Sequence, residues 1–118
     1  MTNSQIQQML PLSLPVFHML VSLMEGERHG YALKREILQR TEKRINLGSG
    51  ALYGAINKML EQGLIVESDD RPDPHLDDER RRYYRITALG RRVLHAEAAR
   101  LRGLVQLAEI RLGIPDPA

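Results

Sequence analysis

Apolar residues return every three or four positions along several stretches of the chain, a spacing that predicts helices. The stretch from Leu14 to Glu25 has this spacing and is followed by Gly26, so it predicts a first helix. A second helix is expected to begin at His29-Gly30 and to end near Thr41 to Lys43. Its apolar face is predicted to consist of Tyr31, Leu33, Ile37 and Leu38.

A third helix is predicted within the stretch from Leu47 to Ile65. Ser49 is expected to cap its N-terminus with the side-chain hydroxyl, and Gly63 is expected to end it. An apolar stripe that faces a core is formed by Leu52, Ile56, Met59 and Leu60. The opposite, polar face carries Ser49, Tyr53, Asn57 and Lys58. Two short helices with a tight join predict a helix-turn-helix, in which this third helix is the recognition helix.

Residues 64–68 and 80–87 predict two strands, joined by a polar, proline-containing tip at residues 69–79. Alternation along the return strand places Arg82, Tyr84 and Ile86 on one side. Arg81, Tyr83, Arg85 and Thr87 lie on the other side. The acidic outgoing strand and the basic return strand are expected to pair across the hairpin. A helix-turn-helix followed by such a hairpin is a winged helix.

The last apolar pattern predicts one long helix, capped by Thr87 and running from Ala88 to about Gly113. Apolar residues alternate at spacings of four and three along one side of it, which is typical of a coiled-coil surface. This heptad seam consists of Leu94, Ala98, Leu101, Val105, Ala108 and Leu112. A winged helix cannot cover so long a surface by itself, so we expect a symmetric dimer.

These elements predict a mainly α fold with a small β-hairpin, in a single compact unit. The winged helix-turn-helix is expected over residues 1–87, with the wing at about 64–87. Residues 88–113 form the dimerisation helix, and residues 114–118 form a tail.

The distribution of charged residues along the chain says more about function than the overall composition does. The formal net charge of the 118 residues is only +2, but the charges are segregated. Basic residues dominate from Arg28 to Lys58 and again from Arg80 to Arg92, whereas acidic residues dominate from Met59 to Glu79. Binding to nucleic acid requires the two basic blocks to converge in space.

Several classes of protein are disfavoured. The chain has no cysteine, which excludes disulfides, a thiolate nucleophile and the usual zinc sites. His75 lies among Asp73, Asp77 and Asp78, but carboxylates on such a tip are usually solvated, so we expect no metal and no cofactor. No motif for catalysis is present, and an enzyme is not expected. The N-terminus lacks a basic signal-peptide region and no apolar run could span a bilayer, so we expect a cytoplasmic protein without membrane contact.

The candidate contacts to double-stranded DNA have ordinary structural alternatives. Tyr53, Asn57 and Lys58 could read bases and phosphates, or form a solvated helix face. Tyr31 and Lys34, at the start of the second helix, could contact phosphates, although Tyr31 could equally pack in the core. Arginines at the start of the return strand could reach DNA or pair with the acidic residues of the tip. These arginines are Arg80, Arg81 and Arg82.

Three motifs in series resemble the PadR family of bacterial transcriptional regulators. They are HGYAL at residues 29–33, GALYGAINKMLEQGLI at 50–65 and RRYYRITALG at 81–90. The resemblance covers roughly Leu14 to Leu112 and, with one helix after the wing, fits the short PadR subgroup. One departure is Ala51, where the family commonly has Thr; Ser49 is expected to supply the missing hydroxyl.

The resemblance implies a homodimer that binds a pseudo-palindromic operator, with the terminal helix packed against the partner's first and terminal helices. It thereby adds Val16 and Leu20 to the expected dimer interface. Many family members are repressors released by a small aromatic or drug-like effector, for which Phe17, Met24 and Leu104 are candidates, with plain dimer core as the alternative. We therefore expect a ligand-responsive repressor. The alternative is a winged-helix protein-interaction adaptor that does not bind DNA.

Overall fold

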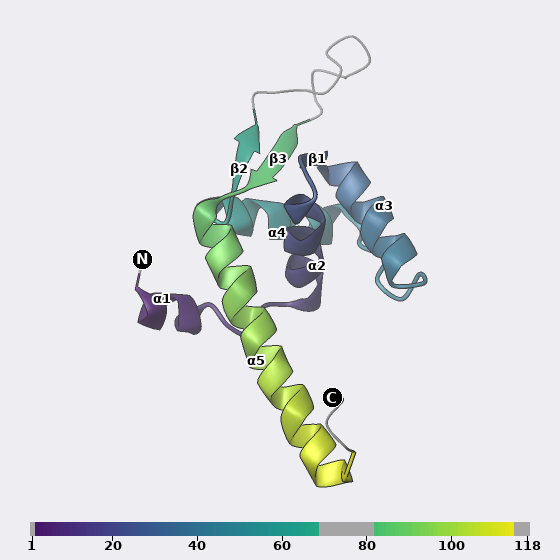
Figure 1. Cartoon of the computed structure of the whole chain (residues 1–118). Coiled ribbons are helices and arrows are strands. Elements are labelled where there is room, and N and C mark those ends of the chain that lie inside the picture. Colours follow the sequence, from purple (N-terminus) through teal and green to yellow (C-terminus); the bar gives the residue numbers. More distant parts are fainter. Residues whose placement is uncertain (1, 69–81, 115–118) are drawn as a thin grey trace.

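The structure is a computed structural model that describes residues 2–68 and 82–114. In this part of the chain, a helix-turn-helix and a small sheet form a body from which one long helix extends (Figure 1). The helices are α1 (Asn3–Gln8), α2 (Leu14–Met24), α3 (Gly30–Arg40), α4 (Ser49–Glu61) and α5 (Ala88–Leu112). The strands are β1 (Arg28–His29), β2 (Ile65–Ser68) and β3 (Tyr83–Ile86). The predicted fold class, a winged helix-turn-helix followed by a long C-terminal helix, is confirmed.

The sheet has three antiparallel strands in the order β1-β3-β2. The predicted pairing of the outgoing and return strands is confirmed, with Ile65 opposite Ile86 and Ser68 opposite Tyr83. The hairpin gains a third strand because β1 pairs with β3, placing His29 opposite Tyr83. Strand β1 was not predicted, since two residues are too few to show a pattern. This strand fixes the wing to the start of α3.

The core lies where α2, α3, α4 and the sheet meet. The predicted apolar stripe of α4 is confirmed, because Leu52, Ile56 and Met59 are buried. The predicted face of α3 is only partly right. Leu33 and Ile37 are fully buried, but the Tyr31 side chain is 55% exposed and points out of the core.

Side chains at the helix termini set where the helices begin. Thr87 caps α5 as predicted, since its Oγ accepts a hydrogen bond from the Gly90 N–H at 3.0 Å. The same hydroxyl donates to the Gly63 carbonyl at 2.6 Å, which ties α5 to the end of α4. The prediction for Ser49 is wrong. Gly48 is the N-cap residue of α4 without a side-chain bond, and Ser49 is already the first helical residue.

Gly63 follows α4 in a left-handed conformation, with φ of 76°, as its predicted role as the end of that helix requires. Gly90 is needed for another reason. A Cβ atom built on it would lie 2.2 Å from the Leu64 carbonyl oxygen and 2.8 Å from Cγ1 of Ile86. The first turn of α5 therefore packs directly on the backbone where β2 begins.

The N-terminal residues, for which the sequence predicted no structure, form α1 and an arm that runs from Met9 to Ser13. Thr2 and Gln5 cap α1 reciprocally, and α1 packs beside α5. The arm is held by Glu97 of α5, whose side chain is only 2% exposed. Its Oε2 accepts the Leu12 backbone N–H at 2.7 Å, and Arg100 donates to both carboxylate oxygens.

This buried carboxylate predicts an acid-sensitive contact. The hydrogen bond from Arg100 lowers the pKa of Glu97 below its ordinary value of 4.5, burial opposes this shift, and the Leu12 N–H adds to it. A lowered folded-state pKa stabilises the fold above pH 4.5, and this contribution is lost as the pH falls further. Glu97→Gln should therefore lower the free energy of unfolding by about 1–3 kcal/mol at pH 7. The difference from the unmodified protein should shrink below pH 4.5.

Urea unfolding at pH 7 and pH 4 measures both effects. Glu109→Gln on the same helix is the matched control, because Glu109 is more exposed than Glu97 and has no ion pair within the described residues. Equal losses of stability in the two variants at pH 7 would show that the Leu12–Glu97 contact does not hold the arm.

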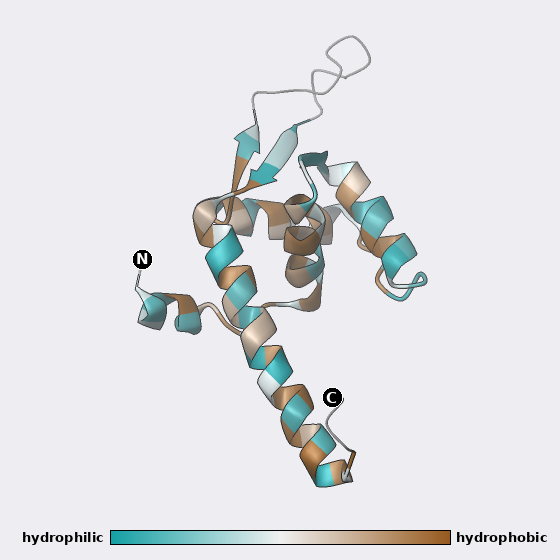
Figure 2. Cartoon of the chain, viewed as in Figure 1, coloured by the Kyte–Doolittle hydropathy of each residue, from teal (hydrophilic) through white to brown (hydrophobic). Residues whose placement is uncertain are grey.

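Helix α5 extends well beyond the body (Figure 1). The Cα radius of gyration is 16.3 Å, against about 13.5 Å for a compact domain of this length. Beyond Arg100 the helix is mostly exposed, including the apolar side chains of Leu104, Val105 and Leu107. Figure 2 shows the hydrophobic residues along this bare half of the helix. None of the described helices is both long and apolar enough to cross a membrane.

Candidate nucleic-acid interface

The outer face of α4 is open along its length. Ser49, Tyr53 and Asn57 follow one another at four-residue intervals and are all exposed. Beside them run Gly50 and Gly54, where an added Cβ would meet no atom within 4 Å. The two glycines leave a flat strip on which a nucleic-acid backbone or a base edge can approach the helix closely.

Four of the predicted DNA contacts line one cleft of about 420 Å³. Tyr53 and Asn57 come from α4, Tyr31 from the first turn of α3, and Arg82 from the start of the return strand. Residues from the two basic blocks of the sequence therefore meet at one place. The cleft is completed by His29, Gly30 and Tyr84.

Gly30 allows α3 and α4 to form this cleft together. A Cβ atom on Gly30 would lie 3.2 Å from the Tyr53 hydroxyl and 3.3 Å from Cδ1 of Ile56. Any larger residue would therefore push the Tyr53 ring outward. His29 orders the same turn, because its Nδ1 accepts the Ala32 N–H at 3.1 Å.

Tyr31 is directed outward by its neighbour on the next turn of α3. The guanidinium carbon of Arg35 lies 5.5 Å from the centre of the Tyr31 ring, a cation–π contact that supports the ring on its polar side. The alternative of a core tyrosine at this position is wrong. Lys34, between the two, is half-buried and does not line the cleft.

Lys58 is on a different side of α4 from the cleft. Together with Gly54 and Ala55 it lines a groove of about 240 Å³ against the N-terminal arm. One residue along a helix is a rotation of about 100°, which separates Lys58 from Asn57. Lys58 remains exposed, so it stays a candidate for a phosphate at the edge of the interface.

Arg82 pairs with the outgoing strand, as predicted for the hairpin. Its Nε lies 3.7 Å from Oε1 of Glu67, and both side chains are largely exposed. A pair this exposed and this long contributes little to stability and leaves the guanidinium available to a stronger anion. Arg80 and Arg81, and the residues His75, Asp73, Asp77 and Asp78 of the hairpin tip, lie outside the described residues. Within those residues no group of three metal-ligating side chains occurs.

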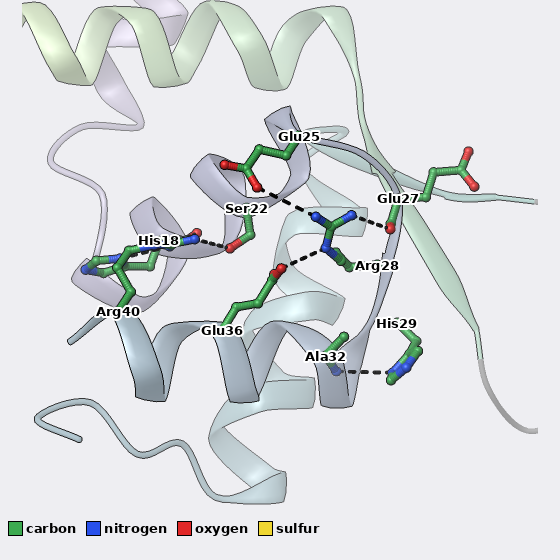
Figure 3. Close-up of polar contacts among 9 residues, drawn as sticks. All are labelled: His18, Ser22, Glu25, Glu27, Arg28, His29, Ala32, Glu36 and Arg40. Atoms are coloured by element: carbon green, nitrogen blue, oxygen red, sulfur yellow. Dashed lines mark hydrogen bonds and ion pairs between the residues drawn. The ribbon is translucent and has the colours of Figure 1, made fainter. Parts of the chain in front are cut away.

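Two partly exposed polar networks brace the helix-turn-helix, and neither was predicted from the sequence (Figure 3). Arg28 donates from Nε to Glu36 at 2.9 Å and lies 3.7 Å from Glu25, joining the end of α2 to α3. Arg40 donates to the Ser22 hydroxyl at 2.7 Å and to the His18 carbonyl at 3.2 Å. Burial, and then the charge of Arg40, lower the pKa of His18, which favours a neutral ring that accepts from Arg40.

The residues predicted for a dimer interface divide into two groups. Leu101 is half-buried, and Val105, Ala108 and Leu112 are exposed. Closer to the body, the heptad seam turns toward the protein's own core, where Leu94 packs. The prediction for Leu20 is wrong, because its position on α2 faces the core and its exposed fraction is 0%. Val16 and Ala98 are half-buried and remain candidates.

The three candidate effector residues are spread over two helices. Phe17 is half-buried in α2, where its ring meets that of His18 edge to face at 6.1 Å. Met24 ends α2 and is 45% exposed, and Leu104 lies on the bare half of α5 and is 50% exposed. An effector site at these residues stays a prediction.

Comparison with known proteins gives one relative by sequence and several solved structures of the same architecture. A Lysinibacillus sphaericus protein called Uncharacterized protein X is 33% identical over 72 residues, which are 61% of this chain and 63% of that protein. The transcriptional regulator Cth-833 from Clostridium thermocellum shares 20% identity with a TM-score of 0.68, over 92% of this chain and 95% of its own. PadR of Bacillus subtilis, solved in complex with operator DNA, shares 20% identity with a TM-score of 0.59. That match covers 73% of this chain and 47% of PadR.

The family model described as the transcriptional regulator PadR-like family matches residues 19–96, from the middle of α2 into α5. These residues include both helices of the helix-turn-helix, the hairpin and the whole cleft between them. Proteins of this family are regulators of transcription, a class that generally lacks enzymatic activity. The chain belongs to the PadR-like family of transcriptional regulators.

Proposed function

We propose that the protein is a sequence-specific DNA-binding transcriptional regulator that acts as a homodimer. The observation that carries the proposal is the cleft in which Tyr31, Tyr53, Asn57 and Arg82 converge beside the open face of α4. Its side chains offer hydroxyl, amide and guanidinium donors, the groups that bind phosphates and base edges in DNA. The operator DNA bound by PadR of Bacillus subtilis supports the same assignment.

The residues of the cleft have separate roles in this proposal. Asn57 is at the centre of the exposed face of α4 and pairs with an adenine edge in the major groove. Tyr31, at the start of α3, and Arg82, in the wing, bind phosphates beside the recognition helix and fix its register. Ser49 and the bare N-terminus of α4 supply further donors to the backbone, while Lys34 and Lys58 extend the basic surface.

The dimer is proposed because the bare half of α5 is apolar on two sides. Leu101, Val105, Ala108 and Leu112 continue the heptad seam, and a second strip on the other side contains Leu107, Ile110 and Ile114. Both apolar strips are exposed in a single protomer. In the proposed dimer, α5 and α2 of the second copy cover them. Two recognition helices related by such a symmetry axis match a pseudo-palindromic operator.

Repression is proposed to be steric, with the dimer covering the promoter. An effector between α2 and α5, near Phe17, Met24 and Leu104, would act by changing the spacing of the two recognition helices. The operator is released if the effector binds the dimer with the altered spacing more tightly than it binds the DNA-bound dimer.

Binding to DNA from the promoter region of the chain's own gene, measured by fluorescence anisotropy at several salt concentrations, tests this function. Asn57→Ala should weaken specific binding by about 1–3 kcal/mol and relax sequence preference at one position. Arg82→Gln should weaken binding to all sequences alike and reduce the slope of log affinity against log salt by about 1. Arg111→Gln, near the far end of α5, is the control and should change neither.

A winged-helix adaptor that binds proteins predicts a different outcome. The internal Arg82–Glu67 pair is the observation in favour of this second function, since a neutralised wing suits a protein surface. In that case the unmodified dimer shows no salt-sensitive, sequence-selective binding to DNA, and Asn57→Ala changes nothing.

A further inference from the structure

A second cleft lies on the far side of α5 from the helix-turn-helix, where α1 packs against the first turns of α5. In Figure 1, α1 is to the left of α5 and α3 is to the right. The cleft has a volume of about 300 Å³. It is lined by Asn3, Ile6 and Gln7 of α1 and by Arg91, Arg92, His95 and Ala96 of α5.

The basic side chains of this cleft share one side of α5. Arg91 and His95 are four residues apart, Arg92 and His95 are three apart, and such pairs are neighbours on a helix. At about 100° per residue, Arg92 and His95 are turned away from the heptad seam, whereas Arg91, seven residues before Ala98, lies at the edge of the seam where the helix joins the body. The proposed dimer therefore leaves Arg92 and His95 uncovered by α5 of the partner, and Arg91 is exposed in the protomer.

The charge of the two guanidinium groups is not neutralised within the described residues. Neither the Arg91 nor the Arg92 side chain forms an ion pair or a hydrogen bond there, in contrast to those of Arg28, Arg40, Arg82 and Arg100. The side chains of Arg35, Arg44, Arg85, Arg102 and Arg111 also form none within the described residues, but of the arginines without such a bond only Arg91 and Arg92 line this cleft. The nearest element, α1, cannot supply a counter-charge, because the first acidic residue of the chain is Glu25. Two adjacent arginines without a carboxylate repel each other, and an anion placed between them relieves this repulsion.

The rest of the lining suits an organic anion better than a bare ion. Ile6 is 4% exposed and forms an apolar floor together with Ala96. Asn3 and Gln7, one turn apart on α1, present amide groups that can donate to or accept from a second polar group of the ligand. Planar guanidinium groups bind carboxylates and phosphates through two parallel hydrogen bonds.

We propose that the cleft between α1 and α5 binds a small multivalent organic anion, such as a di- or tricarboxylate or a phosphate monoester. Arg91 and Arg92 bind the oxyanion groups, His95 adds a ring N–H, and the amides of α1 close the site from the other side. This site is separate from the DNA-binding cleft and from Phe17, Met24 and Leu104. Its existence does not depend on whether the protein binds DNA.

Isothermal titration of the full chain with citrate and with inorganic phosphate, at matched ionic strength set by sodium chloride, tests the proposal. Citrate should bind more tightly than phosphate, because it offers more oxyanion groups. The double variant Arg91→Gln/Arg92→Gln should lose about tenfold or more in citrate affinity. Arg85→Gln/Arg111→Gln removes the same charge from exposed positions elsewhere and should bind citrate as the unmodified protein does.

Assigned NMR signals show whether citrate binds in the cleft between α1 and α5 or elsewhere on the protein. In the unmodified protein, citrate should shift the NMR signals of the His95 ring and of the Asn3 and Gln7 side-chain amides. Equal citrate affinity in the two double variants, or the absence of these shifts at millimolar citrate, would overturn the proposal. So would a lower salt slope of DNA binding in Arg91→Gln/Arg92→Gln without citrate binding, because it would assign the arginines to DNA phosphates.

Discussion

Replacing Gly90 by alanine should unfold the protein at a temperature about 10 °C lower, a loss of about 3 kcal/mol. The new Cβ atom would lie 2.2 Å from the Leu64 carbonyl oxygen. This oxygen is part of the backbone, and it accepts a hydrogen bond from the Thr87 N–H at 3.0 Å. The Thr87 hydroxyl, which donates to the Gly63 carbonyl, also lies 3.0 Å from it. The Leu64 oxygen cannot move aside without breaking the junction between β2, β3 and α5.

Gly103→Ala on the same helix is the matched control. A Cβ atom there meets nothing within 4 Å, so the substitution should stabilise the helix by about 0.5–1 kcal/mol through the lower backbone entropy of alanine. Thermal unfolding of both variants, followed by circular dichroism, separates the clash of the Cβ atom from the gain in helix propensity. Both variants gain the same helix propensity, so the difference between them measures the clash. A Gly90→Ala variant as stable as Gly103→Ala would show that α5 does not pack on the Leu64 backbone.

Glutamate in place of Val105 should convert the proposed dimer to monomers and weaken operator binding by about a hundredfold or more. Val105 is 54% exposed in one protomer and is in the middle of the bare part of the heptad seam. In a symmetric dimer the substitution occurs twice across the same axis, so two unpaired carboxylates would be buried close together. Each half of the operator would then be bound by one protomer alone.

Gln106→Glu introduces the same charge one residue further along, on a polar side of α5, and should leave the dimer intact. Sedimentation velocity at micromolar concentration measures the oligomeric state, and anisotropy on the same operator measures the coupled loss of affinity. A Val105→Glu variant that sediments as a tight dimer would place the interface on another surface.

The spacing of apolar residues was sufficient to predict the helices and strands in which buried positions recur at regular intervals. The stripe of Leu52, Ile56 and Met59, the alternation that puts Tyr84 and Ile86 on one side of the return strand, and the cap at Thr87 are all local patterns, and the structure has them. The cleft was largely predictable too, because Tyr53 and Asn57 had to be opposite that stripe. A signal that pointed to Arg82 was its position in a basic strand next to the recognition helix.

The features that the sequence did not reveal depend on contacts between distant residues. Strand β1 exists only because β3 is beside it, and Glu97 is buried only because Leu12 lies across it. Leu20 has the same chemistry and helical spacing as Val16, and only the packing of α2 decides which of them faces the core. Lys58 and Asn57 are adjacent and equally polar, yet the rotation of α4 separates them.

The bare half of α5 also has a consequence for how long a single copy survives. A helix of about a dozen residues is marginal in water without packing, so this segment of a lone protomer frays. Proteases cut preferentially at poorly ordered ends of a domain. Pairing would protect the segment, and copies that find no partner would be removed first. Proteolysis would then remove unpaired protomers and leave mainly dimers.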